Sequence, residues 1–594
     1  MIGSEQLRQR AAELGAEVSY WDVAGELHHV PDATLRAAVD VLEADAADGG
    51  SRHLEPVIIG SPAGAPVGSL TEFELTLADR TTIELATDQG TVTLPAGLPV
   101  GCHRLAGSGP DGEELATVVV PPPAMPSDPG LAGGVGVFVP TYALWEANAP
   151  LPSFGQLAAL VARAPRIGID VVMTLPLYAG FFDEPFDPSP YSPVSRLHWN
   201  ELYVNDGSLP AAPVPIESDL LDWRALARRR RGQLLDLCRD LDPYLQTAVD
   251  RFVAGRPDVA AFARYRTEHV DPGDAGRPDA LVRRSHEVAQ YLAHRELAAV
   301  EGPGRAVLGL DLPIGSNPDG FEVWAHGDLF ASGMTVGAPP DEFFADGQNW
   351  GFPPQLPAAG RHSGHELWRR LVARAGEHSS LLRIDHVMGV HRLWWIPEGA
   401  GARDGVYVRY PREELLAVIA AQAAITNTTI VGENLGTVPD EVTEAMERWH
   451  MLGMFEEQFL LYDQEDGDLD AIPARSVAGI RTHDMPAFAA AFAGDATGEV
   501  YRYQRRLEAA LGRQIGERAA DVLDGALERL AASAAYLVVA DLDDLVGETA
   551  PHNVPGQVLE TTWRRRLRRP TSEVLAGDDV RRRLKLLRVG RGTR

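Results

Sequence analysis

The 594-residue sequence predicts an α/β protein whose main domain is a (β/α)8 TIM barrel with helical insertions. Two observations lead to this fold class. From residue 126 onward, short apolar, β-branched runs alternate with helical patterns, which is typical of a parallel sheet covered by helices. At least seven such units occur within about 460 residues, and this favours a closed barrel over an open doubly wound sheet.

Two smaller parts are expected before the barrel. Residues 1–51 contain two short amphipathic patterns and form a predicted N-terminal helical segment. Residues 52–125 alternate apolar and polar side chains in runs such as FELTLAD and TIELATD, which predicts a small β-sandwich-like domain. The Pro-rich stretch 121–130 marks a boundary, so the predicted barrel domain covers residues 126–594.

Seven segments of the predicted barrel domain have the composition of buried strands. They are residues 134–140, 170–177, 306–314, 381–387, 428–436, 476–484 and 535–545. Long helical patterns around residues 205–300 predict a helical insertion between the second and the third of these strands.

Composition and charge restrict the kinds of partner. The formal net charge of −30 argues against general affinity for nucleic acid or anionic membranes, which bind basic surfaces. The twelve Lys and Arg of the last 34 residues are therefore expected on a solvated, partly paired helical face. Two cysteines, Cys102 and Cys238, cannot build a disulfide framework. The sequence shows no signal peptide and no run of about 20 apolar residues, so we expect a cytoplasmic protein.

Acidic residues stand at the carboxyl ends of several predicted strands. They are Asp311 after AVLGL, Asp385 after LLRI, Glu433 after TTIVG and Asp484 after SVAGIRTH. In a (β/α)8 barrel these strand ends build the active site, so the side chains should meet in one cleft. One such residue alone is more often a helix cap or a structural ion pair. Three or more together, at the ends of different strands, favour a catalytic site.

Carboxylate pairs in such a cleft bind divalent metals or cleave glycosidic bonds, and the neighbouring residues favour the second use. Arg383 lies two positions before Asp385 on the same strand face, where its charge favours an ionised nucleophile and disfavours a metal. Glu433 has Asn434 beside it and no obvious cation nearby in sequence, which suits a general acid. Spacings typical of metal sites, such as HExxH, are absent from the sequence.

Aromatic and amide side chains near these elements could contact sugars, because flat rings stack on sugar faces and amides bond to hydroxyl groups. The candidates are Tyr191, Trp199, Trp324, Gln348, Trp350, Trp394 and Trp395. An aromatic residue taken alone is more often part of the core. Tyr191 in SPYSP and Trp350 in GQNWGFPP stand in loops rich in Pro and Gly, which favours a role in binding.

Seven separated motifs occur in order along the chain. They are SPYSPVSRLHWNELYVND (189–206), GLDLPIGSNPDGFEVWAHGDLF (309–330), GAPPDEFFADGQNWGFPP (337–354), LLRIDHVMGVHRLWWIPEG (381–399), GENLGTVPDEV (432–442), RTHDMP (481–486) and NVPG (553–556). This set resembles the amylomaltases, the 4-alpha-glucanotransferases of glycoside hydrolase family 77. RIDH alone is shared with the wider alpha-amylase clan, whereas the ordered set is specific to this family.

The resemblance implies a retaining 4-alpha-glucanotransferase that moves alpha-1,4-glucan segments between maltooligosaccharides or to glucose. It implies that Asp385 is the nucleophile, Glu433 the general acid/base, and Asp484 a residue that binds sugar hydroxyls and stabilises the transition state. The residues implied to bind substrate are Tyr191, Asp311, Gln348, Trp350, Arg383, His386 and His483. No metal or organic cofactor is implied, because this chemistry needs only acids and bases.

The chain also departs from the family's usual motifs. PLPSFGQLAAL (150–160) stands where many members carry a GIGDL-like stretch, GENLG replaces GEDLG, and THDMPAF replaces THDN. None of these changes removes a proposed catalytic carboxylate. Two alternatives stay open: a hydrolase or a glucanotransferase of different acceptor specificity on the same site, and an inactive glucan-binding protein. The oligomeric state and the role of the β-domain do not follow from the sequence.

Overall fold

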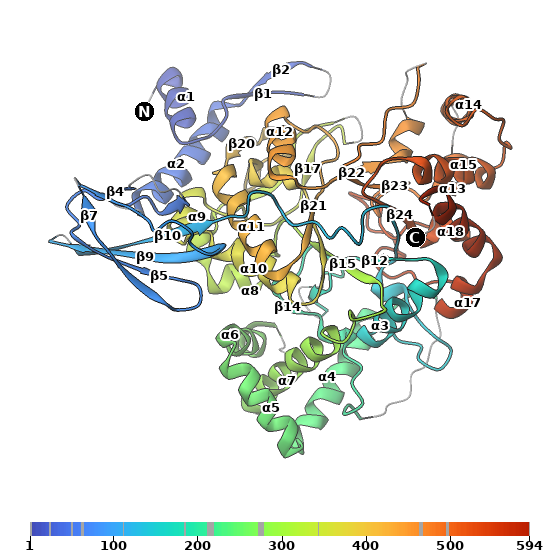
Figure 1. Ribbon diagram of the computed structural model, residues 1–594, viewed down its shortest axis with the longest axis horizontal. Helices are drawn as coiled ribbons and strands as arrows, with labels where there is room; N and C mark the ends of the chain where they lie inside the picture. Colours follow the sequence, from blue (N-terminus) through green and yellow to red (C-terminus); the bar gives the residue numbers. More distant parts are fainter. Residues whose placement is uncertain are drawn as a thin grey trace.

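The computed structural model describes most of the chain. The described residues are 3–22, 25–48, 52–60, 65–88, 90–110, 112–182, 186–210, 219–270, 278–341, 344–462, 467–494 and 498–592. Strands gather at the centre, helices surround them, and a β-domain projects from one side (Figure 1).

The central sheet is a closed parallel barrel. Its strands are β11 (Gly134–Phe138), β12 (Val171–Met173), β15 (Val307–Leu312), β18 (Leu381–Ile384), β21 (Thr429–Gly432), β22 (Gly453–Glu456), β23 (Ser476–Gly479) and β24 (Leu537–Asp541). Parallel ladders join β11 through β21, join β22 through β24, and pair β24 with β11. A bridge between Val431 and Leu452 joins β21 to β22 and closes the ring. The predicted (β/α)8 barrel is confirmed.

Helices follow the barrel strands along the chain. After β11, β12, β15, β18, β21, β23 and β24 come, respectively, α3 (Phe154–Arg163), α7 (Asp279–Leu297), α10 (Glu366–Gly376), α11 (Arg412–Thr426), α12 (Asp440–Trp449), α15 (Ala519–Ala532) and α18 (Asp578–Gly590). Seven strands coincide with predicted segments. The eighth, β22, is not among them, because its short sequence GMFE is followed by a second glutamate and is not continuously apolar.

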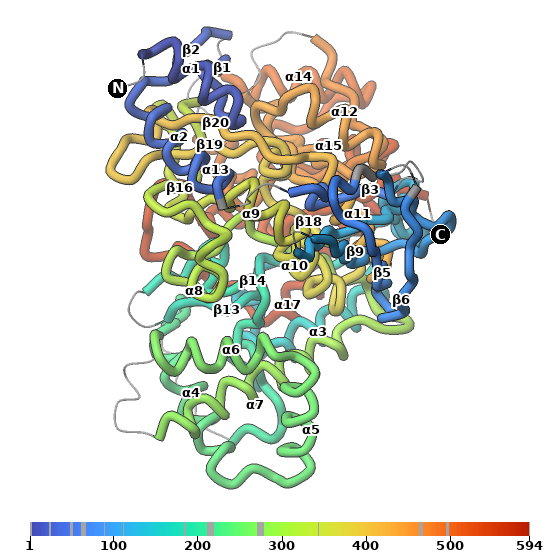
Figure 2. Tube along the Cα trace, turned by 90° about the vertical axis from the view of Figure 1, so that its left-hand side faces the viewer, coloured from blue at the N-terminus to red at the C-terminus, as the bar shows by residue number. Residues whose placement is uncertain are grey.

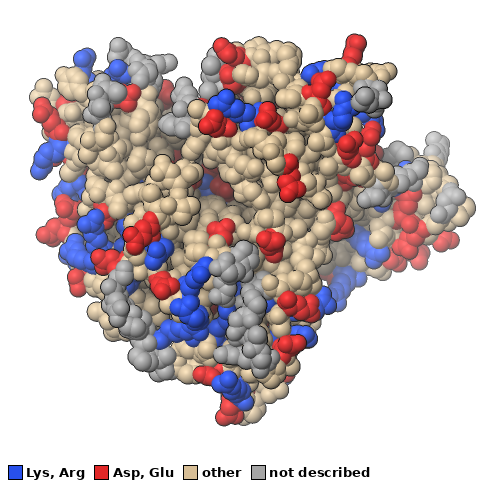
Figure 3. All heavy atoms as spheres, turned by 180° about the vertical axis from the view of Figure 1, so that it is seen from behind, with Lys and Arg blue, Asp and Glu red and all other residues tan. Residues whose placement is uncertain are grey.

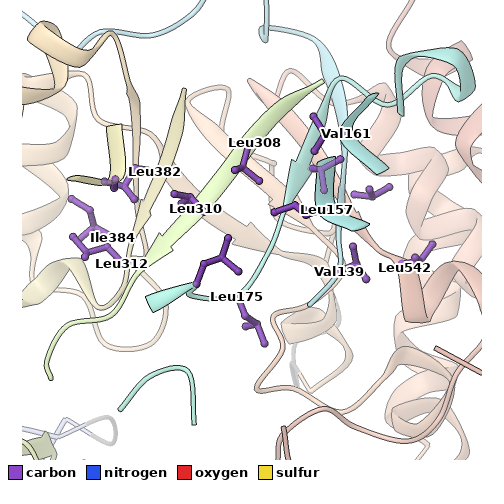
Figure 4. Packing of buried hydrophobic residues seen from close by; sticks show 14 of the residues in the cluster. Val139, Leu157, Val161, Leu175, Leu308, Leu310, Leu312, Leu382, Ile384 and Leu542 are labelled. Carbon is purple, nitrogen blue, oxygen red and sulfur yellow. The ribbon is translucent and has the colours of Figure 1, made fainter. Parts of the chain in front are cut away.

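Side chains of the barrel strands alternate between the helical coat and the interior. On β15, Leu308 and Leu310 pack in one apolar cluster with Leu157 and Val161 of α3 (Figure 4). The intervening residues face the other way, so Asp311 lies in the interior. The lower interior is apolar and includes Val171, Leu381, Val431, Leu452, Val477 and Leu537. Polar residues near the strand ends therefore form the upper layer of the interior.

The N-terminal segment packs on a small sheet that flanks the barrel. The segment comprises α1 (Ser4–Glu13), β1 (Ser19–Trp21), β2 (Leu27–His29) and α2 (Asp32–Asp48), and the sheet comprises β17 (Gln348–Asn349), β16 (Met334–Ala338), β19 (Arg392–Pro397) and β20 (Val406–Arg409). Leu7 and Leu35 share one apolar cluster with Val336 and Trp395. Glu17 adds ion pairs to Arg392 and Arg409.

The β-domain contains two small sheets. One has the order β3 (Val57–Ile59), β10 (Gly112–Val120), β9 (Gly101–Gly109), β5 (Glu72–Thr76) and β6 (Thr82–Leu85), and the other has β4 (Ala65–Pro66), β8 (Thr91–Val92) and β7 (Thr87–Asp88). Val57 and Val119 pack against Ala417, Val418 and Ala421 of α11, which joins this domain to the outer face of the barrel.

The insertion at 205–300 forms a helical lobe, which lies at the bottom of the view in Figure 2. It contains α4 (Trp223–Arg239), α5 (Pro243–Ala254), α6 (Pro257–Tyr265) and α7. Residues 211–218 and 271–277 of this insertion lie outside the described residues. Upstream of the lobe, β13 (Tyr178–Ala179) pairs with β14 (Ser195–Trp199), and the loop between them carries Tyr191.

Several further helices complete the described part of the chain. They are α8 (Phe321–Ala325), α9 (Pro357–His362), α13 (Phe488–Ala493), α14 (Glu499–Leu511), α16 (Leu542–Val546) and α17 (Thr571–Ala576). The basic helix α18 is partly paired as expected, because Arg583 binds Asp524 and Arg588 binds Asp170. Basic and acidic groups are interspersed on the face shown in Figure 3. Within the described residues, no helix has the length and apolar character that a membrane span needs.

Candidate active site

The predicted carboxylates lie at the carboxyl ends of four barrel strands. Asp311 is the penultimate residue of β15, Asp385 directly follows β18, Glu433 directly follows β21, and Asp484 lies beyond β23. Alternation along the strands turns Asp311 and Arg383 into the same upper layer of the barrel.

Arg383 connects two of these carboxylates. Its Nη1 atom donates to both oxygens of Asp311, at 2.7 and 2.9 Å, and to Oδ1 of Asp385 at 2.9 Å. The hydroxyl of Tyr191 donates to Asp311 Oδ2 at 2.6 Å. One guanidinium is therefore shared by Asp311 and Asp385, and the loop residue Tyr191 fixes Asp311.

Glu433 is held by backbone donors. The amide of His386 donates to its Oε2 atom at 2.9 Å, and the amide of Leu435 donates to Oε1 at 2.8 Å. His386 directly follows Asp385, so the first bond ties the neighbouring carboxyl groups to one piece of backbone. Its φ of 45° lies in the left-handed region, a strained conformation that is typical of functional sites.

His483 and Asp484 form the opposite part of the site. The His483 ring stacks on Tyr191, with centroids 4.8 Å apart and planes 8° apart. His483 Nε2 lies 3.3 Å from Asp484 Oδ2, and the amide of Asn553 donates to Asp484 Oδ1 at 2.7 Å. The Asp484 side chain is 46% exposed, so its carboxylate is available to a ligand.

Gln348 and Trp350 approach the site from β17 and the loop after it. The Trp350 ring packs edge-on against His386, with centroids 5.2 Å apart. Its indole N–H points to Gln348 Oε1 at 3.4 Å. All ten predicted site residues therefore form one contiguous group around the barrel mouth, in which Gln348 connects through Trp350 and His386.

Burial raises the pKa of Asp385 to about 7. Arg383 acts in the opposite direction, but its charge is already shared with Asp311, while Asp311, Glu433 and Asp484 add to the rise. The carboxyl group that the sequence predicts to be an ionised nucleophile therefore has a raised pKa. Burial also lowers the pKa of His386 and of His483, which favours neutral imidazoles at the site.

Four further residues at this site are missing from the sequence-based set. Asn553 orients Asp484, and Trp563 lies beside Tyr191 and His483, with ring centroids 6.0 and 5.9 Å away. Glu456 and Asp541 end strands β22 and β24 and line the interior below the site. Asn553 lies in the NVPG motif, which could have revealed it, and Asp541 is an acidic residue within the predicted strand 535–545, which is the signal for it.

The sugar-contact candidates divide into two groups. Trp199, Trp394 and Trp395 are fully buried in the core, and Trp324 packs with Tyr265 away from the catalytic residues. These four tryptophans pack inside the protein, as expected for most aromatic residues. Tyr191 and Trp350, the two loop residues, contact the site.

Two groups of side chains in the described residues have ligand atoms close enough to hold a metal ion. They are His294, Glu377 and His378, and Asp22, Glu26 and His28. None of these six residues is among the ten predicted site residues. In the first set Glu377 is already bound by Arg256 and Arg374, and these two cations disfavour a metal.

The geometry agrees with a match to a protein family. The family model described as 4-alpha-glucanotransferase, glycoside hydrolase family 77, matches residues 274–572, which is half of the chain. The chain belongs to this family. The match contains Asp311, Asp385, Glu433 and Asp484.

Curated relatives extend this family similarity beyond the matched segment. The 4-alpha-glucanotransferase of Mycobacterium tuberculosis is 29% identical over 579 residues, covering 83% of this chain and 79% of the relative. The 4-alpha-glucanotransferase of Haemophilus influenzae is 27% identical over 563 residues, covering 81% and 79%. The chain is thus a glucanotransferase, and this supports the main interpretation over the hydrolase and the inactive binding protein.

Solved structures of the family share the fold. Amylomaltase from Corynebacterium glutamicum aligns with a TM-score of 0.85 at 20% identity, covering 98% of this chain and 99% of the other. Amylomaltase from Streptococcus agalactiae, solved in complex with acarbose, aligns with a TM-score of 0.67 at 21% identity, covering 77% of this chain and 99% of the other. The first alignment includes the N-terminal segment and the β-domain as well as the barrel.

Proposed function

We propose that this site transfers alpha-1,4-glucan segments between maltooligosaccharides, or to glucose, with Asp385 as the nucleophile and Glu433 as the general acid/base. The observation that carries the proposal is the backbone link between the two carboxyl groups, in which the residue after Asp385 donates to Glu433. Arg383 contacts Asp385 and stabilises its ionised form, the form that attacks.

The first step breaks the glycosidic bond. The Asp385 carboxylate attacks the anomeric carbon while Glu433 donates its proton to the departing glycosidic oxygen. The carbon–oxygen bond of the donor breaks, and a covalent glycosyl ester forms on Asp385. Arg383 and Asp311 hold the nucleophile in place throughout.

The second step restores the original configuration at the anomeric carbon. A hydroxyl group of the acceptor glucan gives its proton to Glu433 and attacks the anomeric carbon, and Asp385 leaves as a carboxylate. Two inversions give net retention, which the conversion of one alpha bond into another requires. Water in place of the acceptor would give hydrolysis by the same steps.

The remaining residues of the site are proposed to bind the sugar units. Asp484, fixed by Asn553, accepts hydrogen bonds from sugar hydroxyl groups and stabilises positive charge in the transition state. Trp350 offers a flat ring beside His386. Tyr191, Gln348, Asp311 and His483 complete the proposed subsites. The acarbose complex of the related Streptococcus agalactiae amylomaltase supports a carbohydrate ligand in this cleft.

The proposed setting is cytoplasmic, in accord with two free cysteines and the absence of a disulfide. The proposed chemistry draws on protein acids and bases alone.

Incubation of the purified protein with maltotriose, followed by chromatography, tests the proposal. We expect glucose together with a ladder of longer maltooligosaccharides, and loss of both with Asp385→Asn. Asp579→Asn is a matched control, because the same change is made on a side chain that is 75% exposed on α18.

Three results would contradict the proposal. An active Asp385→Asn variant would remove the assigned nucleophile. Glucose and maltose without a ladder would indicate a hydrolase. The absence of any product would leave a different donor or a binding protein.

A further inference from the structure

A buried carboxyl group lies below the catalytic residues, inside the barrel. Glu456 ends β22 and is 5% exposed. It pairs in the ladder with Gly479 of β23, and a Cβ atom on that glycine would lie 2.7 Å from Glu456 Oε2. A side chain at position 479 would displace the carboxyl group, so this glycine makes room for it.

Glu456 borders a cavity of about 50 Å³, which is large enough to hold water. The polar residues around this cavity are Thr174, Asp311, Arg383, Arg481, Thr482, His483 and Asp541. Glu456 Oε2 is buried and makes no hydrogen bond within the described part of the chain. Apolar side chains, among them Phe138, Met173 and Met454, form the rest of the lining, and a water that reaches the polar groups can satisfy Glu456 Oε2.

The nearest cations are already engaged elsewhere. Arg383 binds Asp311 and Asp385. Arg481 pairs with Asp541 and Asp544 at 2.9 Å each. Among the described residues, Glu456 therefore has no cation as an ion-pair partner.

The charges that face Glu456 come from four neighbouring elements. They are Arg383 from β18, Glu433 beyond β21, Arg481 beyond β23 and Asp541 from β24. Burial raises the pKa of Glu456 to about 8; the two arginines oppose this shift, and Glu433 and Asp541 add to it. A neutral carboxyl group at this place adds no negative charge beneath the nucleophile.

We propose that Glu456 is a positioning residue of the transfer reaction: as a neutral carboxyl group it donates a hydrogen bond to water in the cavity below Arg383 and so holds the guanidinium against Asp385. The inference rests on the proposed roles of Asp385 and Glu433. The proposal requires that the Glu456 side chain, which lies beneath Asp385, is polar and uncharged.

Two substitutions separate polarity from charge. Glu456→Gln keeps the shape and polarity of a neutral carboxyl group, so we expect kcat within about threefold of wild type and an unchanged acid limb of kcat/KM. Glu456→Leu keeps the bulk and loses the hydrogen bond, so we expect kcat to fall by about tenfold or more at a similar KM for maltotriose.

The adjacent glutamate is a matched control. Glu457 is also buried, but it is bound by Tyr503 at 2.8 Å and by Arg529 on the outer side of the barrel. Glu457→Gln should lower the melting temperature without moving the pH profile.

An infrared difference spectrum gives a readout that is independent of activity. Wild type minus Glu456→Gln at pH 6.5 should show the carbonyl stretch of a protonated carboxylic acid. Carboxylate bands in its place would overturn the proposal, because Glu456 would then be ionised. The same conclusion would follow if Glu456→Gln moved the acid limb to lower pH by more than about half a unit, since removing a real charge lowers the pKa of Asp385.

Failure of this inference can be told apart from failure of the proposed function. Wild-type activity in a folded Glu456→Leu variant, together with an inactive Asp385→Asn variant, would refute only the role of Glu456. Activity in Asp385→Asn would refute the catalytic assignment, whatever the infrared spectrum shows.

Discussion

Asp311 controls the pH range in which the proposed nucleophile works. Both carboxylates contact the same Nη1 atom of Arg383, so the charge of Asp311 raises the pKa of Asp385. Asp311→Asn removes that charge and leaves Arg383 to Asp385 alone. We therefore expect the pKa of Asp385 to fall.

The size of the shift follows from the geometry. The bonds of 2.7 and 2.9 Å to one nitrogen place the two carboxylate oxygens within about 5.6 Å of each other. At an effective dielectric constant of about 20, unit charges at this distance interact by about 3 kcal/mol. One pKa unit corresponds to about 1.4 kcal/mol, so the pKa of Asp385 should fall by about two units.

The assay is the pH dependence of kcat/KM for maltotriose disproportionation, measured as initial glucose release. The nucleophile acts as a carboxylate, so kcat/KM falls as the pH drops through the pKa of Asp385 in the free enzyme. The acid limb should lie near pH 7 in wild type and near about pH 5 in Asp311→Asn.

Tyr191→Phe provides the control for this experiment. It removes the hydroxyl group that donates to Asp311 without changing any charge, so it should lower the plateau of kcat/KM and leave the acid limb in place. An acid limb in Asp311→Asn that stays at the wild-type pH, or moves upward, would refute the reasoning. The charge on Asp311 would then not act on the nucleophile.

Three further changes test other parts of the structure. Glu433→Gln should lower kcat by about 10²–10⁴-fold with little change in glucan binding, because the proton donor is lost, and steady-state kinetics with a binding titration would show it. Arg481→Met should destabilise the fold by about 3–5 kcal/mol, because it leaves buried Asp541 and Asp544 without their partner, and urea unfolding measures this. Leu35→Ala should cost about 2–5 kcal/mol by opening a cavity between α2 and the sheet beneath it; unchanged urea unfolding would contradict that packing.

The barrel could be predicted because most of its strands are buried on both faces. Strand β12 is apolar throughout, and strand β24 is apolar up to Asp541, for this reason. Strand β22 could not be predicted in this way, because it ends in Glu456. This residue turns inward to the polar layer, and Glu457, directly after it, turns outward to Arg529. A short strand that ends in two charged residues has no apolar signature, and its register appears only in three dimensions.

The catalytic carboxylates could be predicted from their positions at strand ends. What the sequence could not reveal is how charge is distributed among them. Arg383 stands two residues from Asp385 in the chain, but its second partner, Asp311, lies 72 positions away. Asn553 likewise reaches Asp484 from 69 positions along the chain. Such contacts depend on barrel closure and on long loops, which no local pattern specifies.

The N-terminal segment supports one edge of the predicted site, although none of its described residues is among the ten predicted site residues. Helices α1 and α2 pack on the sheet formed by β17, β16, β19 and β20. The edge strand of this sheet, β17, contains Gln348, and Trp350 directly follows the strand. We expect a change in this packing to move Trp350, whose ring is proposed to bind the glucan. Chimaeras between family members should therefore exchange residues 3–48 together with the loop around Trp350, because both pack in the same apolar cluster.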